Sequence, residues 1–125
     1  MAYQYDNENI FAKILRGEIP NTTVMETDHS LAFRDIRPQA PEHVLVIPKG
    51  AYITYDHFAN EATDAEILDF TRLIGKIAKE LGLEPHDGSG GFRMISNAGE
   101  DSMQEVPHMH VHMVAGRPLG GLLPI

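Results

Sequence analysis

Hydrophobic positions recur at helical spacing in two parts of the chain. The first stripe follows Asn7, which can cap a helix, and stops before Gly17; it consists of Ile10, Phe11, Ile14 and Leu15. The second stripe follows Thr63, which fits a capping box with Glu66; it consists of Ile67, Phe70, Ile74, Ile77 and Leu81. The pattern predicts a short N-terminal helix and a long central helix, whose stripe packs against the core.

Shorter apolar runs and alternating segments predict the strands. Strands are expected at residues 22–27, 31–35 and 43–48, before the long helix, and at residues 92–97 and 108–113, after it. No strict strand–helix–strand alternation is present, so the order favours an α+β fold with an antiparallel sheet and helices on one face. The last two strands are expected to pair across the loop between them.

The predicted last strand carries a histidine at every second position, in the segment HMHVHM. Side chains alternate along a strand, so His108, His110 and His112 share one face, opposite a face of Met and Val side chains that packs under the helices. His43 opens the strand at 43–48 and could lie beside the three histidines, although its position alone favours a structural, partly buried histidine. His57 and His86 have polar neighbours and are expected at the surface.

Three uses for this histidine row remain open from spacing alone: a metal site, a nucleophile or a solvated polar face. The row spans roughly 13 Å, which fits a single ion poorly. A His-x-His pair with His43 could bind zinc, but no carboxylate has an obvious companion spacing. A neutral imidazole is a good nucleophile when its other nitrogen is held by a hydrogen bond, and flanking histidines could donate to a phosphoryl group. The pattern therefore favours a central nucleophile with flanking donors.

Composition narrows the class of partner. The chain has 125 residues, a formal net charge of −8 and no cysteine. Its length suits one domain, its acidity argues against long nucleic acids and anionic membranes, and the missing thiols exclude disulfides and thiolate metal sites. A mononucleotide remains compatible. The sequence shows no apolar run of membrane-spanning length and no signal peptide, so a cytoplasmic protein is expected.

Several segments resemble one known family in sequence and in order. They are IFAKILRGEIP, LAFRDIRPQAPEHVLVIPK, GFRMISNAGE and QEVPHMHVHMVAGRPLG, and together they resemble the Hint-like, nucleotide-binding branch of the histidine triad (HIT) superfamily. The resemblance implies a single domain over residues 1–125 with a short C-terminal tail at 115–125. It also implies a five-stranded antiparallel sheet with two helices, and a homodimer that joins two sheets into one of ten strands.

The activity implied by the resemblance is that of a purine nucleoside 5'-monophosphoramidase or related nucleotidyl hydrolase. Such an enzyme cleaves the bond between the α-phosphate of an AMP or GMP derivative and an amine or similar leaving group. The alternatives are a dinucleoside polyphosphate hydrolase and a nucleotide-binding scaffold with incidental hydrolysis. No cofactor is required in the family; zinc is possible but not favoured.

The resemblance also assigns roles by position. His110 becomes the nucleophile, His112 the donor to the phosphoryl oxygens, and His108 and His43 complete the imidazole network. Asp35 becomes the acceptor for the ribose hydroxyls, although its residue type alone indicates a turn. The implied nucleotide-binding positions are Ile19, Phe33, Arg34, Asp35, Ile36, Asn97, Met103, Gln104, Glu105, Val106, His110 and His112.

Two departures fall in the loop expected to hold the phosphate. Ser102 and Met103 stand where the family often has two glycines, and Glu105 stands where some members have a serine. An ionised carboxylate accepts hydrogen bonds but does not donate them, so an altered leaving-group preference is expected rather than loss of activity. In the family the C-terminal tail can reach the partner's site; a packed or frayed terminus is an equal alternative here.

Overall fold

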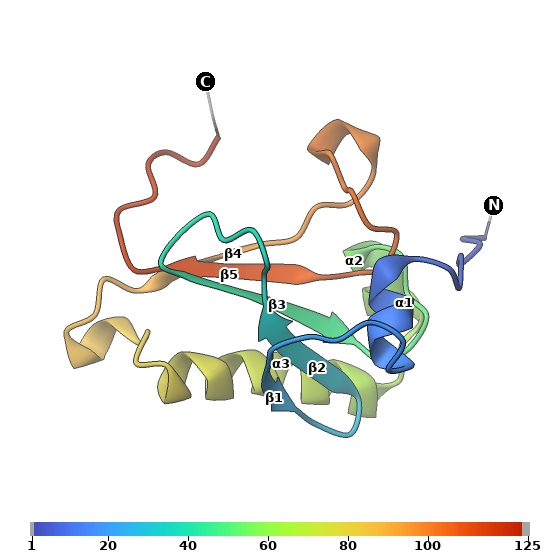
Figure 1. Ribbon diagram of the computed structural model, residues 1–125, viewed down its shortest axis with the longest axis horizontal. Coiled ribbons are helices and arrows are strands. Elements are labelled where there is room, and N and C mark those ends of the chain that lie inside the picture. The colour runs from blue at the N-terminus through green and yellow to red at the C-terminus, as the bar shows by residue number, and fades with distance from the viewer. Residues whose placement is uncertain (1, 124–125) are drawn as a thin grey trace.

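The fold is α+β, with a five-stranded antiparallel sheet and three α-helices over residues 2–123, which the computed structural model describes (Figure 1). The elements are α1 (Ile10–Leu15), β1 (Thr23–Glu26), β2 (Ser30–Arg34), β3 (Glu42–Pro48), α2 (Tyr55–Glu61), α3 (Asp64–Glu80), the 3₁₀ turn η1 (Pro85–Asp87), β4 (Phe92–Ile95), the 3₁₀ turn η2 (Glu100–Ser102) and β5 (Val111–Ala115). The strand order is β1-β2-β3-β5-β4. The predicted fold class and the pairing of the last two strands are confirmed.

Helices cover both faces of the sheet, so the prediction of helices on one face is wrong. Val44 and Val46 of β3 face a core that includes α2 and α3, whereas Leu45 and Ile47 face a second core with Phe11 of α1. The reason is visible in the sequence of β3. Every residue from Val44 to Ile47 is apolar and buried, which is typical of a strand covered on both faces.

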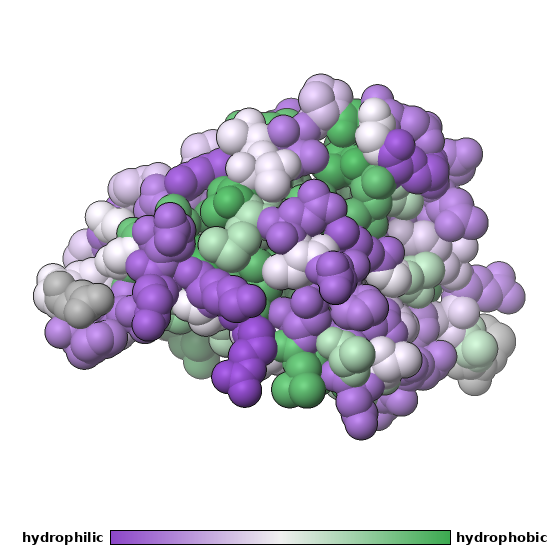
Figure 2. All heavy atoms as spheres, turned by 90° about the horizontal axis from the view of Figure 1, so that it is seen from below, coloured by the Kyte–Doolittle hydropathy of each residue, from purple (hydrophilic) through white to green (hydrophobic). Residues whose placement is uncertain are grey.

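The helix α3 follows its prediction. The Thr63 side chain accepts the Glu66 N–H and the Glu66 carboxylate accepts the Thr63 N–H, so the predicted capping box is present. Of the predicted stripe, Phe70 and Ile77 are buried, and Ile67, Ile74 and Leu81 are partly buried. The helix also buries Leu73 and Ala78, which the predicted stripe did not include. Seen from below relative to Figure 1, the surface is mostly hydrophilic, and its hydrophobic residues form small groups (Figure 2).

Two helical details differ from the prediction. The helix α1 is capped by Asn9, whose side chain accepts the Ala12 N–H, and not by Asn7. The helix α2 has no counterpart in the prediction, because seven residues with two buried side chains give too short a periodic signal. One of these side chains is His57, which is buried rather than at the surface: its Nδ1 accepts the Ile53 N–H.

The last strand begins later than predicted. β5 starts at Val111, so His108 and His110 precede it, held by other contacts such as the hydrogen bond from the Met109 N–H to the Tyr52 carbonyl. The alternation of side chains continues through this segment nevertheless. Met109, Val111 and Met113 lie in the core beneath α3, as predicted. The histidines are on the other side, but they are not solvated: His108 and His110 are buried and His112 is half-buried.

The C-terminal tail is held to the domain by two arginines. Arg117 donates to the Gln39 carbonyl, and the Arg93 guanidinium of β4 donates to the carbonyls of Gly120 and Gly121. Leu122 and Leu123 are exposed. The last two residues of the predicted tail, 124–125, lie outside the described residues. No helix within residues 2–123 has both the length and the apolar character needed to span a membrane.

Candidate active site

A cleft of about 540 Å³ opens on the α1 face of the sheet. Its volume lies within the range of small-molecule sites, roughly 300–1,000 Å³. Most of the predicted site residues line it: Ile19, Phe33, Arg34, Asp35, Ile36, His43, Asn97, Met103, Glu105, Val106, His110 and His112. Two predicted residues, His108 and Gln104, lie outside it. Its apolar floor also includes the buried side chains of Phe11, Ile14 and Leu45, and exposed Ile10 lies at its rim; the sequence analysis did not single out these four residues for the site.

His110 lies buried in the cleft with one ring nitrogen occupied. Its Nδ1 is 2.7 Å from the His108 carbonyl oxygen. A carbonyl only accepts, so Nδ1 carries the hydrogen and the Nε2 of the neutral ring keeps a free lone pair. Burial lowers the pKa of His110, and the negative charges of Asp35 and Glu105 offset part of that effect. At neutral pH the ring is therefore an uncharged base with a defined tautomer.

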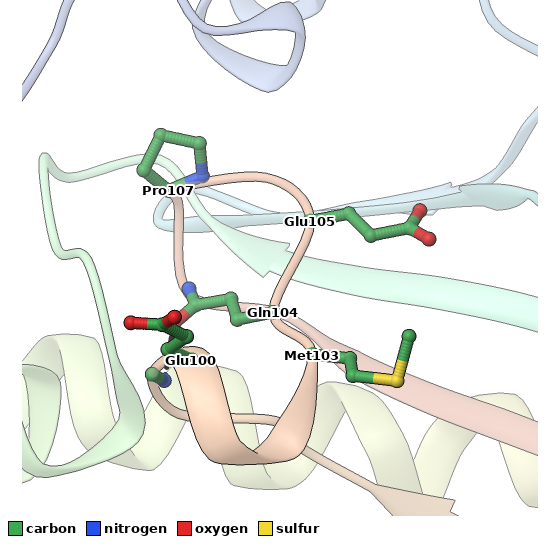
Figure 3. Close-up of a pocket in the computed structure, with 6 residues that line it drawn as sticks. Glu100, Met103, Gln104, Glu105 and Pro107 are labelled. Atoms are coloured by element: carbon green, nitrogen blue, oxygen red, sulfur yellow. Dashed lines mark hydrogen bonds between the residues drawn. The ribbon is translucent and has the colours of Figure 1, made fainter.

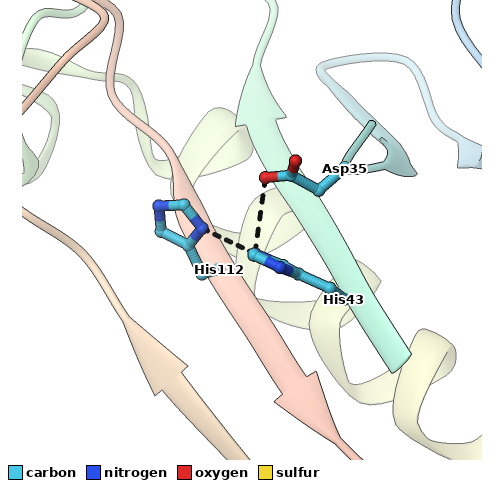
Figure 4. Close-up of side chains that lie close together, drawn as sticks. All are labelled: Asp35, His43 and His112. Carbon is cyan, nitrogen blue, oxygen red and sulfur yellow. Dashed lines mark hydrogen bonds and ion pairs between the residues drawn. The ribbon is translucent and has the colours of Figure 1, made fainter. Parts of the chain in front are cut away.

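His43 and His112 form a second chain of defined tautomers (Figure 4). The Gln39 N–H donates to His43 Nδ1 at 3.0 Å, so the hydrogen of neutral His43 is on Nε2. That Nε2 lies 2.9 Å from His112 Nδ1 and 3.5 Å from Asp35 Oδ2. His112 Nδ1 therefore accepts, and the hydrogen of neutral His112 is on its Nε2. Burial and the neighbouring histidines lower the pKa of His112 to about 4, which keeps this ring neutral at pH 7.

Asp35 serves both the cleft and the turn after β2. Its Oδ1 accepts the Arg37 N–H at 2.8 Å, so the turn role suggested by its residue type is present. Its side chain remains partly accessible in the cleft, with 19% of its surface exposed. The neighbouring Arg34 lines the cleft, but its Nη1 is 2.9 Å from both carboxylate oxygens of Glu42. The Arg34 cation is thus already paired.

His108 is 0% exposed and lies behind the cleft. Its Nε2 is 2.8 Å from the Pro48 carbonyl, so Nε2 carries the hydrogen and Nδ1 accepts from the Tyr5 hydroxyl at 2.5 Å. Burial lowers its pKa to about 4. Within residues 2–123, the two ring nitrogens of His108 thus pair with Pro48 and Tyr5, and His108 reaches His110 through its main-chain carbonyl. Tyr5 lies in a mostly polar segment with no periodic pattern, so sequence reasoning did not single it out.

The loop between β4 and β5 keeps a glycine-like bend without glycine at residue 103. Met103 has φ +62° and ψ +43°, a left-handed conformation that costs a residue with a side chain about 1–2 kcal/mol. The Gln104 side chain fixes the bend: its oxygen accepts the Gly99 N–H, and its amide donates to the Ile53 and Val106 carbonyls. The departure at Met103 therefore leaves the loop with the backbone shape that a glycine would favour.

The side chains of this loop point to two sides (Figure 3). Glu100 and Gln104 point to one side, where they line a shallow hollow with Pro107. Met103 and Glu105 point to the other side and also line the cleft. Both of these side chains are exposed, so they lie at the cleft's mouth and not on its floor. Glu105 places a negative charge near enough to His110 to offset part of the pKa lowering that burial causes.

Among the described residues, Asp35, His43 and His112 bring three possible metal-ligand atoms within 4.8 Å of one another. The hydrogen bonds around His43 do not fit an ion there. A neutral imidazole that binds a metal through Nε2 carries its hydrogen on Nδ1. His43 Nδ1 already accepts the Gln39 N–H, so metal binding would place two donors against each other. The donor set therefore suits a hydrogen-bond chain better than a metal centre.

Comparison with known proteins gives a family match over most of the chain. The model of the HIT domain matches residues 16–119. An uncharacterized HIT-like protein of Azospirillum brasilense is 55% identical, over 98% of each chain. A purine nucleoside phosphoramidase of Escherichia coli is 40% identical over 93% of each chain, and a 14 kDa zinc-binding protein of Zea mays is 42% identical over 91% of this chain and 86% of its own.

Solved structures agree with the family match. A histidine triad protein from Clostridium difficile has a TM-score of 0.79 and 41% identity, covering 96% of this chain and all of that one. A histidine triad nucleotide-binding protein from Candida albicans has a TM-score of 0.76 and 29% identity, covering 94% of this chain and 85% of that one.

Proposed function

The chain belongs to the HIT domain family, and we propose that it is a purine nucleoside 5'-monophosphoramidase that works through His110. The observation that carries the proposal is the free Nε2 of His110 in the cleft, beside a second imidazole whose Nε2 carries a hydrogen. The 40% identity to the phosphoramidase of Escherichia coli supports the substrate class. The coarser activity, hydrolysis at a nucleotide phosphate, rests on the family as a whole.

The proposed reaction has two steps at the α-phosphorus. His110 Nε2 attacks phosphorus and forms a new P–N bond. The P–N bond to the amine breaks, and the amine leaves with that electron pair and takes up one proton from solvent. The imidazole becomes positively charged, and the His108 carbonyl stabilises this charge through Nδ1–H. Water then forms a new P–O bond, breaks the bond to Nε2 and releases one proton. The products are a nucleoside monophosphate and a free amine.

The remaining cleft residues have roles that fit a nucleotide. We infer that His112 donates its Nε2–H to a phosphoryl oxygen, because His43 occupies its other nitrogen. Asp35 accepts from the ribose hydroxyls, and the base lies against Ile19, Phe33 and Ile36. Asn97 and the backbone of residues 103–106 hold the phosphate. The relative from Candida albicans, a nucleotide-binding protein of the same fold, supports this use of the cleft.

A substrate panel tests the proposal against its alternatives. Adenosine and guanosine 5'-phosphoramidates, a dinucleoside tetraphosphate and the free monophosphates are compared at high enzyme concentration. Preferred turnover of the phosphoramidates supports the proposal. Preferred turnover of the dinucleotide assigns the protein to the polyphosphate hydrolases, and tight monophosphate binding with negligible turnover of either substrate makes it a scaffold.

We further propose that the reaction needs no metal. The relative from Zea mays is a zinc-binding protein, but the donor atoms of Asp35, His43 and His112 fit a hydrogen-bond chain. Metal content and turnover are measured before and after chelation. Full turnover by metal-free protein supports the proposal, whereas loss on chelation and recovery with zinc would contradict it.

Glu105 is expected to favour substrates whose leaving amine carries a second, positive charge. Its exposed carboxylate lies at the mouth of the cleft, close enough to affect His110. An exposed ion pair contributes about 0.2–1 kcal/mol, so Glu105→Gln should reduce the preference for a diamine over a neutral amine of equal length by about 1.5- to 5-fold. The ratio of kcat/KM for the two phosphoramidates measures the effect. An unchanged ratio would rule out this role, and Glu100→Gln, an exposed carboxylate of the same loop that points away from the cleft, is the matched control.

We infer that two copies pair through β4. This strand ends the sheet, and its Met94 and Ile95 side chains are exposed, which is unusual for an unprotected edge. Sedimentation is expected to give twice the chain mass, and Ile95→Lys to shift the mass toward a monomer. A monomeric wild-type protein at micromolar concentration would contradict the inference.

A further inference from the structure

The segment before α1 reaches the back of the histidine row. It precedes residues 16–119, which the family model matches. The Tyr5 hydroxyl lies 2.5 Å from His108 Nδ1, and the two rings meet edge to face with centroids 5.5 Å apart. Tyr3 secures the same segment: its ring stacks on His57 at 4.6 Å and its hydroxyl donates to Asp56 at 2.6 Å. The segment is therefore attached at two points, and one of them is a histidine of the row.

The direction of the Tyr5 hydrogen bond follows from the other side of the ring. Pro48 can only accept, so His108 Nε2 carries the hydrogen and Nδ1 needs a donor. The Tyr5 hydroxyl is that donor, and burial raises the pKa of Tyr5, so it keeps its proton. Without the hydroxyl, a nitrogen of a ring that is 0% exposed would lose its partner. Such a loss typically costs about 1–3 kcal/mol.

The consequence reaches His110 through the main chain. The His108 carbonyl holds His110 Nδ1–H at 2.7 Å, and this contact leaves Nε2 of His110 free. The His108 ring also meets the Phe11 ring in a T-shaped contact with centroids 6.2 Å apart, and the Phe11 ring contacts His110 at a centroid distance of 5.0 Å. A His108 ring that tilts, or that gains a proton at Nδ1, would disturb both contacts. Tyr5 and His110 are the titratable groups that face His108 within the described chain.

We propose that Tyr5 is a positioning residue for the reaction: it fills Nδ1 of His108 and thereby holds the His108 carbonyl and the tautomer of His110 in place. This inference rests on the proposed function for its kinetic part. Its structural part, the tautomer of the two histidines, stands without substrate. Tyr5 itself does not line the cleft and does not touch the reacting atoms.

The test compares Tyr5→Phe with Tyr3→Phe. Phenylalanine keeps the ring contacts in both variants, and Tyr3 loses a hydroxyl that donates to exposed Asp56, outside the cleft. Tyr5→Phe is expected to lower kcat about 10-fold, the equivalent of one lost hydrogen bond, with KM nearly unchanged. The acid limb of its kcat profile should move to higher pH, because His108 Nδ1 is open to a proton. Tyr3→Phe should keep the wild-type profile.

Nitrogen NMR of the imidazoles separates this inference from the proposed function. The wild-type protein should show His108 with hydrogen on Nε2 and His110 with hydrogen on Nδ1, and Tyr5→Phe should shift the His108 Nδ1 signal and raise the pH at which it titrates. A Tyr5→Phe protein with unchanged imidazole signals and an unchanged pH profile would overturn the inference, even if it were less stable. Absence of turnover in the wild-type protein, with the NMR shifts as expected, would overturn the proposed function and leave the role of Tyr5 in fixing the tautomer.

Discussion

Replacing His110 with alanine is expected to reduce turnover of an adenosine 5'-phosphoramidate by at least about 1,000-fold, as removal of an enzyme's nucleophile does. The physical reason is the loss of the imidazole whose unprotonated Nε2 faces the cleft. In neutral His112 the Nε2 carries the hydrogen, so it cannot replace His110 as an attacking base. KM should change far less than kcat, because Asp35 and the apolar floor remain.

The control for this experiment is His57→Ala. His57 is also a buried histidine, but it lies in α2 and does not line the cleft. Both variants lose an imidazole, so circular dichroism and urea unfolding establish whether each is folded before turnover is compared. In addition, mass spectrometry of rapidly quenched wild-type protein should show a nucleotidyl adduct that is missing from His110→Ala. If His110→Ala retains wild-type turnover, the proposed mechanism is wrong.

The alternation of the sequence was sufficient to place the histidines on one side and their neighbours on the other. It worked because Met109, Val111 and Met113 bury their side chains against the α3 core, whether or not each residue belongs to the regular strand. The same period-2 argument placed His43 on the face of Leu45, and Leu45 pairs with His112 in the sheet register. The contact between His43 and His112 was therefore within reach of sequence reasoning, which nevertheless preferred a structural role for His43.

The burial of the histidine face was not predictable from alternation. An alternating strand normally has one solvated face, and the short α1 gives no sign of which face it covers. Phe11 of α1 packs against the rings of His108 and His110, which converts a polar face into a buried one with lowered pKa values. Tyr5 was also beyond prediction, since its hydrogen bond joins residues 103 positions apart. Such contacts depend on the folded chain and leave no periodic signal.

The departures from the family pattern have different outcomes. Met103 adopts the left-handed backbone that a glycine would take, so the loop tolerates the substitution at an energetic cost. Gln104 shows why the loop can absorb that cost, because its side chain makes three hydrogen bonds that close the bend. Glu105 is different, since it changes the charge at the mouth of the cleft and not the backbone conformation of the loop. The chemistry of the leaving group is therefore where this chain is expected to differ from its relatives.

Stability should fall steeply between pH 6.5 and pH 4.5 because of the buried histidines. The pKa of His108 is about 4 in the folded protein, against 6.5 for an unperturbed histidine. The unfolded chain therefore binds more protons in this interval, and its population rises as the pH falls. The contribution of His108 is complete above pH 6.5 and has been lost by pH 4, a change of about 3 kcal/mol. His110, His112 and His43 act in the same direction, because burial lowers their pKa values too.

Carboxylates lose their contribution at lower pH, which makes the histidine interval separable. Glu66 and Asp69 have pKa values lowered from 4.5 and 3.8, so their stabilisation is lost only below those values. Urea unfolding at several pH values should give a free energy of unfolding that rises from pH 4.5 to pH 6.5. His108→Gln should reduce the slope of this rise by the equivalent of nearly one bound proton. Glutamine can still donate to the Pro48 carbonyl and does not titrate, so the comparison isolates the imidazole. An equal slope in the two proteins would mean that His108 has the same protonation state in the folded and the unfolded protein. It would exclude the burial of His108 as the source of acid sensitivity.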